Sequence, residues 1–187
     1  MKGIVFNMLT DLVEERFGLD AWDGLIEETQ PASEGAYTAV AVYPDEELLG
    51  YVNALARRTS ASAADICRLF GEFMLHKFAE IHPEFFDGHT AKSFLQSVHD
   101  VIHVEVRKLH PDVVLPEFTY GDPGPDELIL NYHSPRELCH LAEGLITGAG
   151  QHFGVNISWS HDVCMHDGAD HCRLGLHFEA APAAAVG

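Results

Sequence analysis

Two histidines four residues apart, His99 and His103, are the first residues of this chain whose type and spacing could do chemistry. They lie in a stretch whose apolar residues recur at helical spacing, so both side chains fall on about the same helix face. A neutral imidazole that a helix presents to an apolar cavity can be the axial ligand of a haem iron. A partly buried structural histidine fits the same pattern. Zinc would need a further ligand at suitable spacing, and no neighbouring residue supplies one.

A second polar group is the segment Tyr132-His-Ser-Pro-Arg136, where a strand is expected to end and a helix to begin. Ser134 and Glu137 have the spacing of a capping box, with proline at the first helical position, and capping alone explains both residues. It does not explain Tyr132 or Arg136. A guanidinium fork and hydroxyls near a helix N-terminus suit a carboxylate, because the fork binds it bidentately and the helix end favours anions. Haem carries two such carboxylates.

Three cysteines and a histidine near the C-terminal end have spacings that suit a tetrahedral zinc site. Buried cysteines also act as small apolar side chains, so the pattern leaves both interpretations open. His166 and His171, in or near an expected turn, are alternative ligands, and Cys67, on an apolar helix, is assigned to the core. The candidate ligands are Cys139, His161, Cys164 and Cys172.

The elements expected to position these groups give an α+β fold, with a helical N-terminal part and a small antiparallel sheet packed on helices. A capping box over Ser62–Asp65 begins a helix that reaches Pro83. One expected helix begins at Val5, and three others cover 62–82, 91–109 and 134–153. A loop is expected at 30–35. The expected strands cover 127–132, 155–159 and 172–178, the last two joined by a turn at Asp167–Asp170.

Length and charge limit the number of domains, the location and the kind of partner that the sequence allows. The 187 residues fit one domain over 1–179, with an N-terminal helical subdomain over about 1–62 and a disordered tail over 180–187. No apolar run is long enough to span a membrane, and the first residues lack the apolar core of a signal peptide, so we expect a soluble cytoplasmic protein. A net charge of −18 disfavours nucleic acid and membrane surfaces as partners and favours a protein with a basic face.

Taken in order, these motifs resemble the haem-nitric oxide/oxygen binding (H-NOX) family, relatives of the sensor domain of soluble guanylate cyclase. The resemblance runs to about Glu179 and is carried by Met1-Lys-Gly3, Val98-His-Asp-Val-Ile-His103, Pro111, Leu115-Pro-Glu-Phe118 and Tyr132-x-Ser134-x-Arg136. It implies a helical subdomain, a four-stranded antiparallel sheet and haem b. His103 becomes the proximal iron ligand, and Pro116 a contact that distorts the macrocycle. Tyr132, Ser134 and Arg136 become the clamp of the haem carboxylates.

The resemblance also bears on the gas and on zinc. Family members that hold O₂ stably use a distal tyrosine with polar support, whereas the matching positions here are Leu141, Leu9 and Met74. With Val5 and Leu145 they predict a distal pocket without a hydrogen-bond donor, and hence selectivity for nitric oxide (NO). Some members carry zinc on three cysteines and a histidine in the C-terminal region and sense oxidation through it, which favours the zinc interpretation of the four candidate ligands.

The resemblance further implies that NO weakens the iron–His103 bond and that a separate partner, such as a histidine kinase or a cyclic-di-GMP enzyme, reads the change. The alternatives are a redox sensor acting through the Cys₃His zinc site, a sensor of O₂ or CO, and a structural module without haem. We expect no enzymatic activity, because no Cys–His pair lies in a nucleophile context and no distal acid or base is evident.

Overall fold

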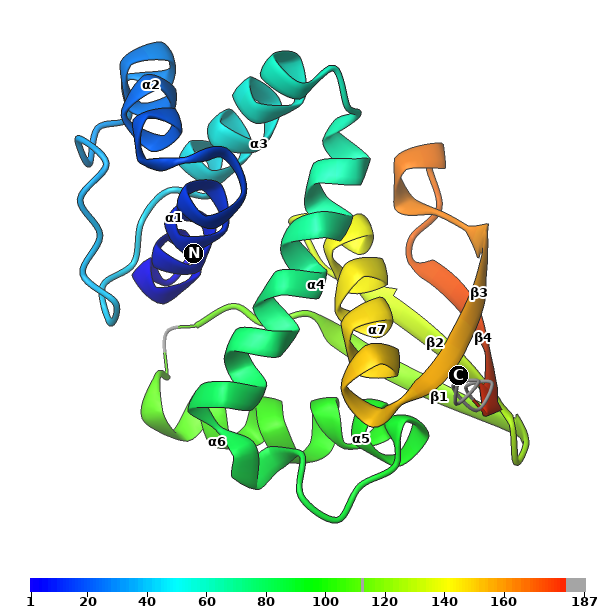
Figure 1. Cartoon of the computed structure of the whole chain (residues 1–187). Coiled ribbons are helices and arrows are strands. Elements are labelled where there is room, and N and C mark those ends of the chain that lie inside the picture. The colour runs from blue at the N-terminus through cyan, green and yellow to red at the C-terminus, as the bar shows by residue number, and fades with distance from the viewer. Residues whose placement is uncertain (112, 181–187) are drawn as a thin grey trace, which may run out of the picture.

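The computed structural model describes residues 1–111 and 113–180. The helices are α1 (Gly3–Phe17), α2 (Leu19–Thr29), α3 (Asp45–Thr59), α4 (Ala63–Ile81), η1 (Pro83–Phe85), α5 (Ala91–Ser97), η2 (Val98–Ile102), α6 (His103–Leu109), α7 (Cys139–Phe153) and η3 (Met165–Asp167). The strands are β1 (Glu117–Gly124), β2 (Glu127–His133), β3 (Val155–Val163) and β4 (Cys172–Ala180). Figure 1 shows the helical N-terminal half and the sheet of the C-terminal half, as the α+β prediction requires.

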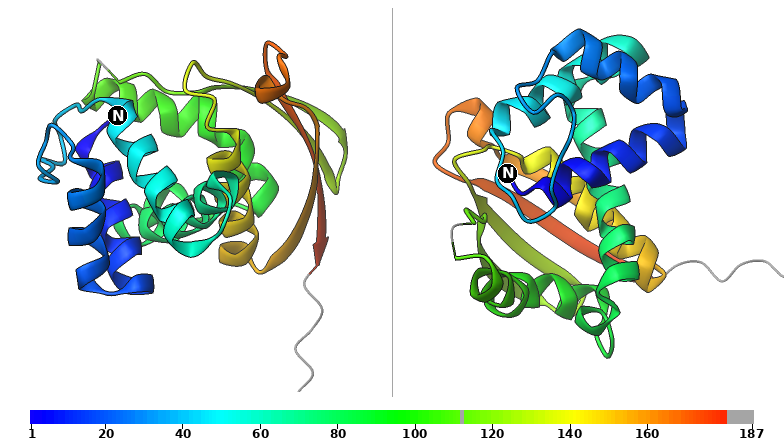
Figure 2. Two further views of the ribbon diagram at one scale, coloured as in Figure 1. Left: turned by 90° about the horizontal axis from the view of Figure 1, so that it is seen from above. Right: turned by 90° about the vertical axis from the view of Figure 1, so that its left-hand side faces the viewer.

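The four strands form one antiparallel sheet in the order β1-β2-β4-β3. Alternate residues of β2 are buried, as expected for a sheet with one covered face. The covering helix is α7, so that the N-terminal helices, the central helices and the sheet follow one another across the molecule (Figure 2). The residue pattern did not predict strand β1, because Gly121 and Pro123 interrupt the alternation of apolar and polar residues along it.

Helices α4 and α7 lie side by side and are the most closely joined pair of elements (Figure 1). Glycine makes this approach possible. A Cβ added to Gly71 would lie 2.2 Å from the Leu141 carbonyl oxygen, and one added to Gly144 would lie 2.0 Å from the Arg68 carbonyl oxygen. The predicted capping box begins α4, since the Ser62 hydroxyl accepts a hydrogen bond from the Asp65 backbone N–H and the Asp65 carboxylate accepts one from Ser62.

The single helix expected over 91–109 is interrupted. Helix α5 begins at Ala91, but the turn over Val98–Ile102 is a π-helix, and α6 starts only at His103. Such wide turns inside α-helices are rare, and those that occur often lie at functional sites. The helical periodicity of the apolar residues is compatible with either winding, so the sequence did not reveal the interruption.

The helix expected over 134–153 begins later, at Cys139. Leu138 is its N-cap, and Glu137 has a φ of 51°, in the left-handed region, so the capping box predicted for Ser134 and Glu137 is wrong. At the other end of the chain, Ala180 is the last residue of β4 and pairs with Val155 instead of opening the predicted tail. The remainder of that tail, 181–187, lies outside the described residues.

Candidate cofactor site and metal cluster

His103 is the first residue of α6 and follows directly on the π-helix η2. Its ring centroid lies 5.5 Å from that of Phe118 on β1. The Nδ1 atom of His103 is buried and has no hydrogen-bond partner among the described residues. Since buried polar atoms are nearly always paired, an unpaired imidazole nitrogen of this kind is suited to bind a ligand.

The other histidine of the pair, His99, has a different role. Its Nδ1 accepts a hydrogen bond from the Phe118 backbone N–H at 3.3 Å, which ties η2 to the first strand. Burial lowers the pKa of His103 to about 4, and the nearby His99 and Arg107 act in the same direction, while the neighbouring Pro116 backbone opposes them. His103 is therefore a neutral imidazole near pH 7, the form that binds metals. Pro116 lies beside it.

The segment from Tyr132 to Arg136 bends back on itself between β2 and α7. The buried Tyr132 hydroxyl accepts a hydrogen bond from the Leu138 backbone N–H at 3.0 Å. The buried Ser134 hydroxyl accepts one from the Arg136 backbone N–H at 3.3 Å. These contacts are present in place of the predicted capping box, and the two hydroxyls and the Arg136 guanidinium belong to one short segment of the chain.

Arg136 has a partner that sequence reasoning missed. Its Nε donates to Asp45 Oδ2 at 2.6 Å, and one of its terminal nitrogens donates to the Val114 carbonyl at 2.6 Å. The other oxygen of Asp45 pairs with the Met1 ammonium at 2.6 Å. Burial raises the pKa of Asp45, but the Met1 ammonium and Arg136 outweigh it, so that the pKa lies below its usual range. Asp45 follows Pro44 in the first turn of α3 and by sequence resembles an ordinary helix-end acid.

A pocket of about 180 Å³ adjoins this ion pair. Its polar lining comes from Asp45, Glu46 and Arg136, and Leu48, Leu49 and Pro135 add apolar surface. The pocket joins the loop before α7 to the start of α3, two segments that are 91 residues apart at the Asp45–Arg136 contact. A carboxylate that reached Arg136 here would compete with Asp45 for the guanidinium.

The five apolar residues predicted to line the distal side lie in the N-terminal hydrophobic cluster. Leu9 and Met74 are buried within it, and the other three pack against it. Residues around His103 instead belong to the C-terminal cluster, which contains Tyr132 and packs against Ile102 and Phe118. Leu145 contacts both clusters. The apolar set is Val5, Leu9, Met74, Leu141 and Leu145.

These residues fit a haem. The unpaired buried imidazole of His103 lies on the side of the C-terminal cluster, and the N-terminal cluster offers apolar side chains. Arg136 lies in the same segment as the Tyr132 and Ser134 hydroxyls. A porphyrin needs those three features, because its faces are apolar, its iron takes a nitrogen ligand and its two carboxylates need donors.

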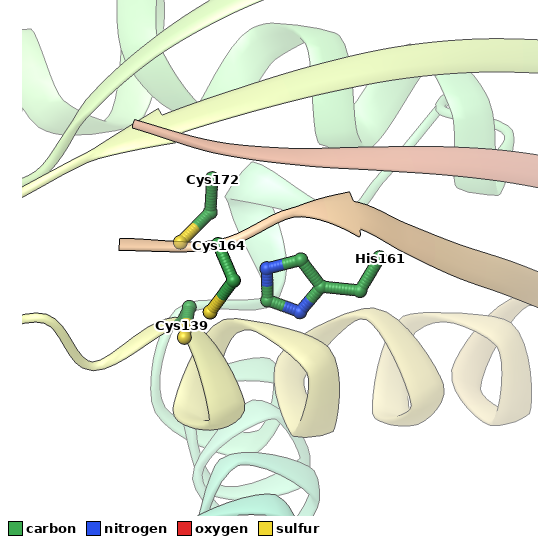
Figure 3. A group of neighbouring side chains, drawn as sticks. All are labelled: Cys139, His161, Cys164 and Cys172. Atoms are coloured by element: carbon green, nitrogen blue, oxygen red, sulfur yellow. The ribbon is translucent and has the colours of Figure 1, made fainter. Parts of the chain in front are cut away.

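The four candidate zinc ligands come together at the N-terminal end of α7 (Figure 3). One ligand atom from each of Cys139, His161, Cys164 and Cys172 lies within 4.8 Å of every other. The cysteines are free thiols, and Cys139 and Cys172 are buried. Burial raises the pKa of Cys139, and the neighbouring Cys172 and Cys164 thiols raise it further. Deprotonating such a group of thiols requires a nearby positive charge, which a bound metal ion provides.

Of the remaining candidate residues, His166 lies beside this group, with one ligand atom each of His166, His140 and Cys139 within 4.8 Å of one another, whereas Cys67 and His171 belong to no such group among the described residues. Cys67 is buried in the N-terminal cluster, and burial raises the pKa of its thiol to about 11, in agreement with a core role. His166 stacks on His140 with a ring-centroid distance of 5.4 Å, next to the cluster. His171 pairs with the exposed Asp170 carboxylate at 2.6 Å.

None of the helices in residues 1–111 and 113–180 combines the length and the apolar character needed to cross a bilayer.

Comparison with known proteins identifies the family. The model of the family described as Haem-NO-binding matches residues 2–161. The crystal structure of an H-NOX protein from S. oneidensis in the Fe(II)NO ligation state is 38% identical, over 96% of this chain and 99% of that chain, with a TM-score of 0.90. That of the Fe(II) unliganded H-NOX mutant A71G from K. algicida is 30% identical, over 96% and 97%, with a TM-score of 0.87.

A third relative agrees with the first two. The solution structure of the IWP-051-bound H-NOX from Shewanella woodyi in the Fe(II)CO ligation state is 33% identical, over 99% of this chain and 97% of that chain, with a TM-score of 0.82. No protein with a curated function matches the chain. The motif order, the fold and these matches agree, and the chain belongs to the H-NOX family of haem-binding gas-sensor domains.

Proposed function

We propose that this protein is a sensor of nitric oxide that holds haem b on His103. The observation that carries the proposal is the distal set Val5, Leu9, Met74, Leu141 and Leu145, in which no side chain can donate a hydrogen bond. Bound O₂ carries partial negative charge and depends on such a donor. A hydrogen bond to a charged acceptor contributes about 1.5–3 kcal/mol, so its absence costs roughly tenfold to a hundredfold in O₂ retention. NO has no such requirement.

Different residues of the chain would bind different parts of the cofactor. His103 supplies the nitrogen ligand, Tyr132, Ser134 and Arg136 hold the haem carboxylates, and Pro116 presses on the macrocycle beside His103. Haem bound here would supply an iron that binds NO, and His103 would be the protein ligand whose hold on that iron the gas weakens. Because His103 begins α6 directly after the π-helix, release of its side chain would allow the α5–η2–α6 segment to move against β1.

The test is spectroscopic. Ferrous protein exposed to NO should shift its Soret band to that of five-coordinate nitrosyl haem, and air should give no lasting oxy complex. A stable oxy spectrum would contradict the NO assignment while leaving haem binding intact. A protein that stays colourless after haem supplementation would contradict both. The S. oneidensis relative, determined in an Fe(II)NO ligation state, is a suitable positive control.

The response is proposed to reach a separate signalling protein, such as a histidine kinase or a cyclic-di-GMP enzyme, in the cytoplasm, where free thiols stay reduced. We propose no catalytic activity for this chain. With a net charge of −18, it favours a partner with a basic docking face, and association should weaken as salt rises. Alternatively the sensed gas is O₂ or CO, and the oxygen arm of the spectroscopic test separates O₂ from NO.

A second proposed function is redox sensing at zinc bound by Cys139, His161, Cys164 and Cys172. The observation that favours it is the approach of all four ligand atoms to within 4.8 Å. Structural zinc takes four such ligands in a tetrahedron, with Zn–S near 2.3 Å and Zn–N near 2.0–2.1 Å. Oxidation of a thiolate removes a ligand and releases the metal, which would loosen the connection between β3, β4 and α7.

Metal analysis tests this second function. Reduced protein should contain about one zinc per chain, because residues 1–111 and 113–180 contain one four-ligand cluster. Hydrogen peroxide should release it, as measured with a chromophoric zinc indicator. Replacing Cys139, Cys164 and Cys172 together should remove both the zinc and any oxidant-dependent signalling. Cys67→Ala, which removes the one cysteine outside the cluster, should leave the zinc content unchanged. Signalling that still responds to oxidant without the three thiols would exclude the redox function.

A further inference from the structure

Glu143 on α7 is a carboxylate in the interior, only 1% exposed, and it faces three nitrogen-bearing side chains. Its Oε1 lies 2.6 Å from Nδ1 of His161. Its Oε2 lies 2.7 Å from Nε of Arg68 and 3.0 Å from Nδ1 of His140. Burying a carboxylate costs several kcal/mol unless such partners offset it. The haem site, as assigned above, makes no use of this residue.

The contact with His161 decides which nitrogen of that histidine is free. A carboxylate that accepts from an arginine Nε–H is an ionised acceptor, so the hydrogen atom between Glu143 and His161 belongs to Nδ1 of the imidazole. The lone pair of His161 is then on Nε2. That nitrogen is buried and has no hydrogen-bond partner among the described residues. The ring stands beside the three cysteine sulfurs in Figure 3.

We propose that Glu143 is the positioning residue of the zinc site, fixing the tautomer and the ring orientation of His161 so that Nε2 faces the three thiols. The proposal rests on the proposed binding of zinc. Carboxylates that accept from the free N–H of a metal-bound histidine raise the basicity of the ligand, and their loss costs about 10–100-fold in metal affinity.

Arg68 on α4 binds Oε2 of Glu143, whereas His161 contacts Oε1. Its guanidinium bridges Glu143 and Asp65, and it lies 5.9 Å from the ring of Trp159 on β3. The backbones of α4 and α7 touch here, since the Arg68 carbonyl faces Gly144. These contacts fix the position of the Glu143 carboxylate, which in turn holds the His161 imidazole next to helices α4 and α7.

The direct experiment compares metal affinities in the full chain. Glu143→Gln keeps the shape of the side chain and removes its charge. We expect zinc affinity, measured by competition with a chromophoric chelator, to fall by about 10–100-fold. Glu72→Gln is the matched control. Glu72 lies on α4 and is also a carboxylate that joins α4 to α7, through Gln151 Nε2 at 3.0 Å, but away from the cluster, and its loss should leave zinc affinity unchanged.

A double variant separates positioning from general stability. In His161→Cys, four thiols remain as ligands and no imidazole needs orienting, so adding Glu143→Gln should no longer weaken zinc binding. An equal loss in both backgrounds would overturn the positioning role. Failure of the wild-type chain to bind zinc would instead overturn the zinc site itself, and with it this inference.

If Glu143→Gln does not fold, the wild-type protein still gives an answer. Long-range ¹H–¹⁵N correlation spectra of the zinc-loaded chain should show His161 protonated at Nδ1 and bound to metal through Nε2. Binding through Nδ1 would overturn the proposal, because Glu143 faces that nitrogen.

Discussion

Replacing His103 with glycine should abolish stable haem binding. Nδ1 of His103 is the buried imidazole nitrogen left without a partner near the apolar cluster, and the other histidine on this face, His99, is engaged by the Phe118 N–H. Without the side chain nothing at this position ties the iron to α6. Purified His103→Gly protein should lose its Soret absorbance on gel filtration, and added imidazole should restore it.

His99→Gln is the matched control for this experiment, since an amide oxygen can still accept from Phe118 and haem should stay bound. Arg136→Ala should have an intermediate effect, with haem affinity reduced by roughly tenfold to a hundredfold if its guanidinium pairs with a haem carboxylate. Full haem retention by His103→Gly without imidazole would show that another residue binds the iron.

Gly144→Ala should destabilise the fold strongly. The new methyl group would lie 2.0 Å from the Arg68 carbonyl oxygen and 2.8 Å from its carbon, and both are backbone atoms of α4 that cannot turn aside. The two helices would have to separate. Overpacking costs typically about 1–3 kcal/mol, and a clash with immovable backbone belongs at the upper end, which outweighs the gain of about 1 kcal/mol from replacing glycine by alanine within a helix. Urea denaturation should therefore show a lower midpoint.

Gly50→Ala in α3 provides the matched comparison. Its added Cβ would meet only the Thr29 methyl, at 3.9 Å, so the substitution should stabilise the protein by about 0.4–1 kcal/mol. A Gly144→Ala protein as stable as the Gly50→Ala protein would mean that α4 and α7 are not packed as closely as described.

Features set by neighbours in the sequence could be predicted from it. The capping box at Ser62 depends on four consecutive residues, and it is present. The similar pattern at Ser134 failed because the Tyr132 hydroxyl takes the Leu138 N–H and the chain turns at Glu137 with a positive φ. Local spacing could not reveal that competing contact.

The candidate sites show the same division. Cysteine and histidine are chemically distinctive, so the residues of the cysteine–histidine cluster could be chosen by type and spacing. Glu143 and Asp45 could not. Each resembles an exposed helix acid in the sequence, and only the tertiary structure brings Glu143 to Arg68, 75 residues away, and Asp45 to Arg136, 91 residues away.

The wide turn at Val98–Ile102 also sets the rotational register of the helix that carries His103. Successive residues of an α-helix are about 100° apart around its axis, because a turn takes 3.6 residues. A π turn accommodates one residue more, so it offsets every side chain beyond it by about that angle relative to a continuous α-helix. This offset helps to set the direction in which His103 points, towards Phe118. The side-chain direction of His103, the proposed haem ligand, thus depends on the wider winding of the backbone before it, which no side-chain substitution at position 103 would reveal.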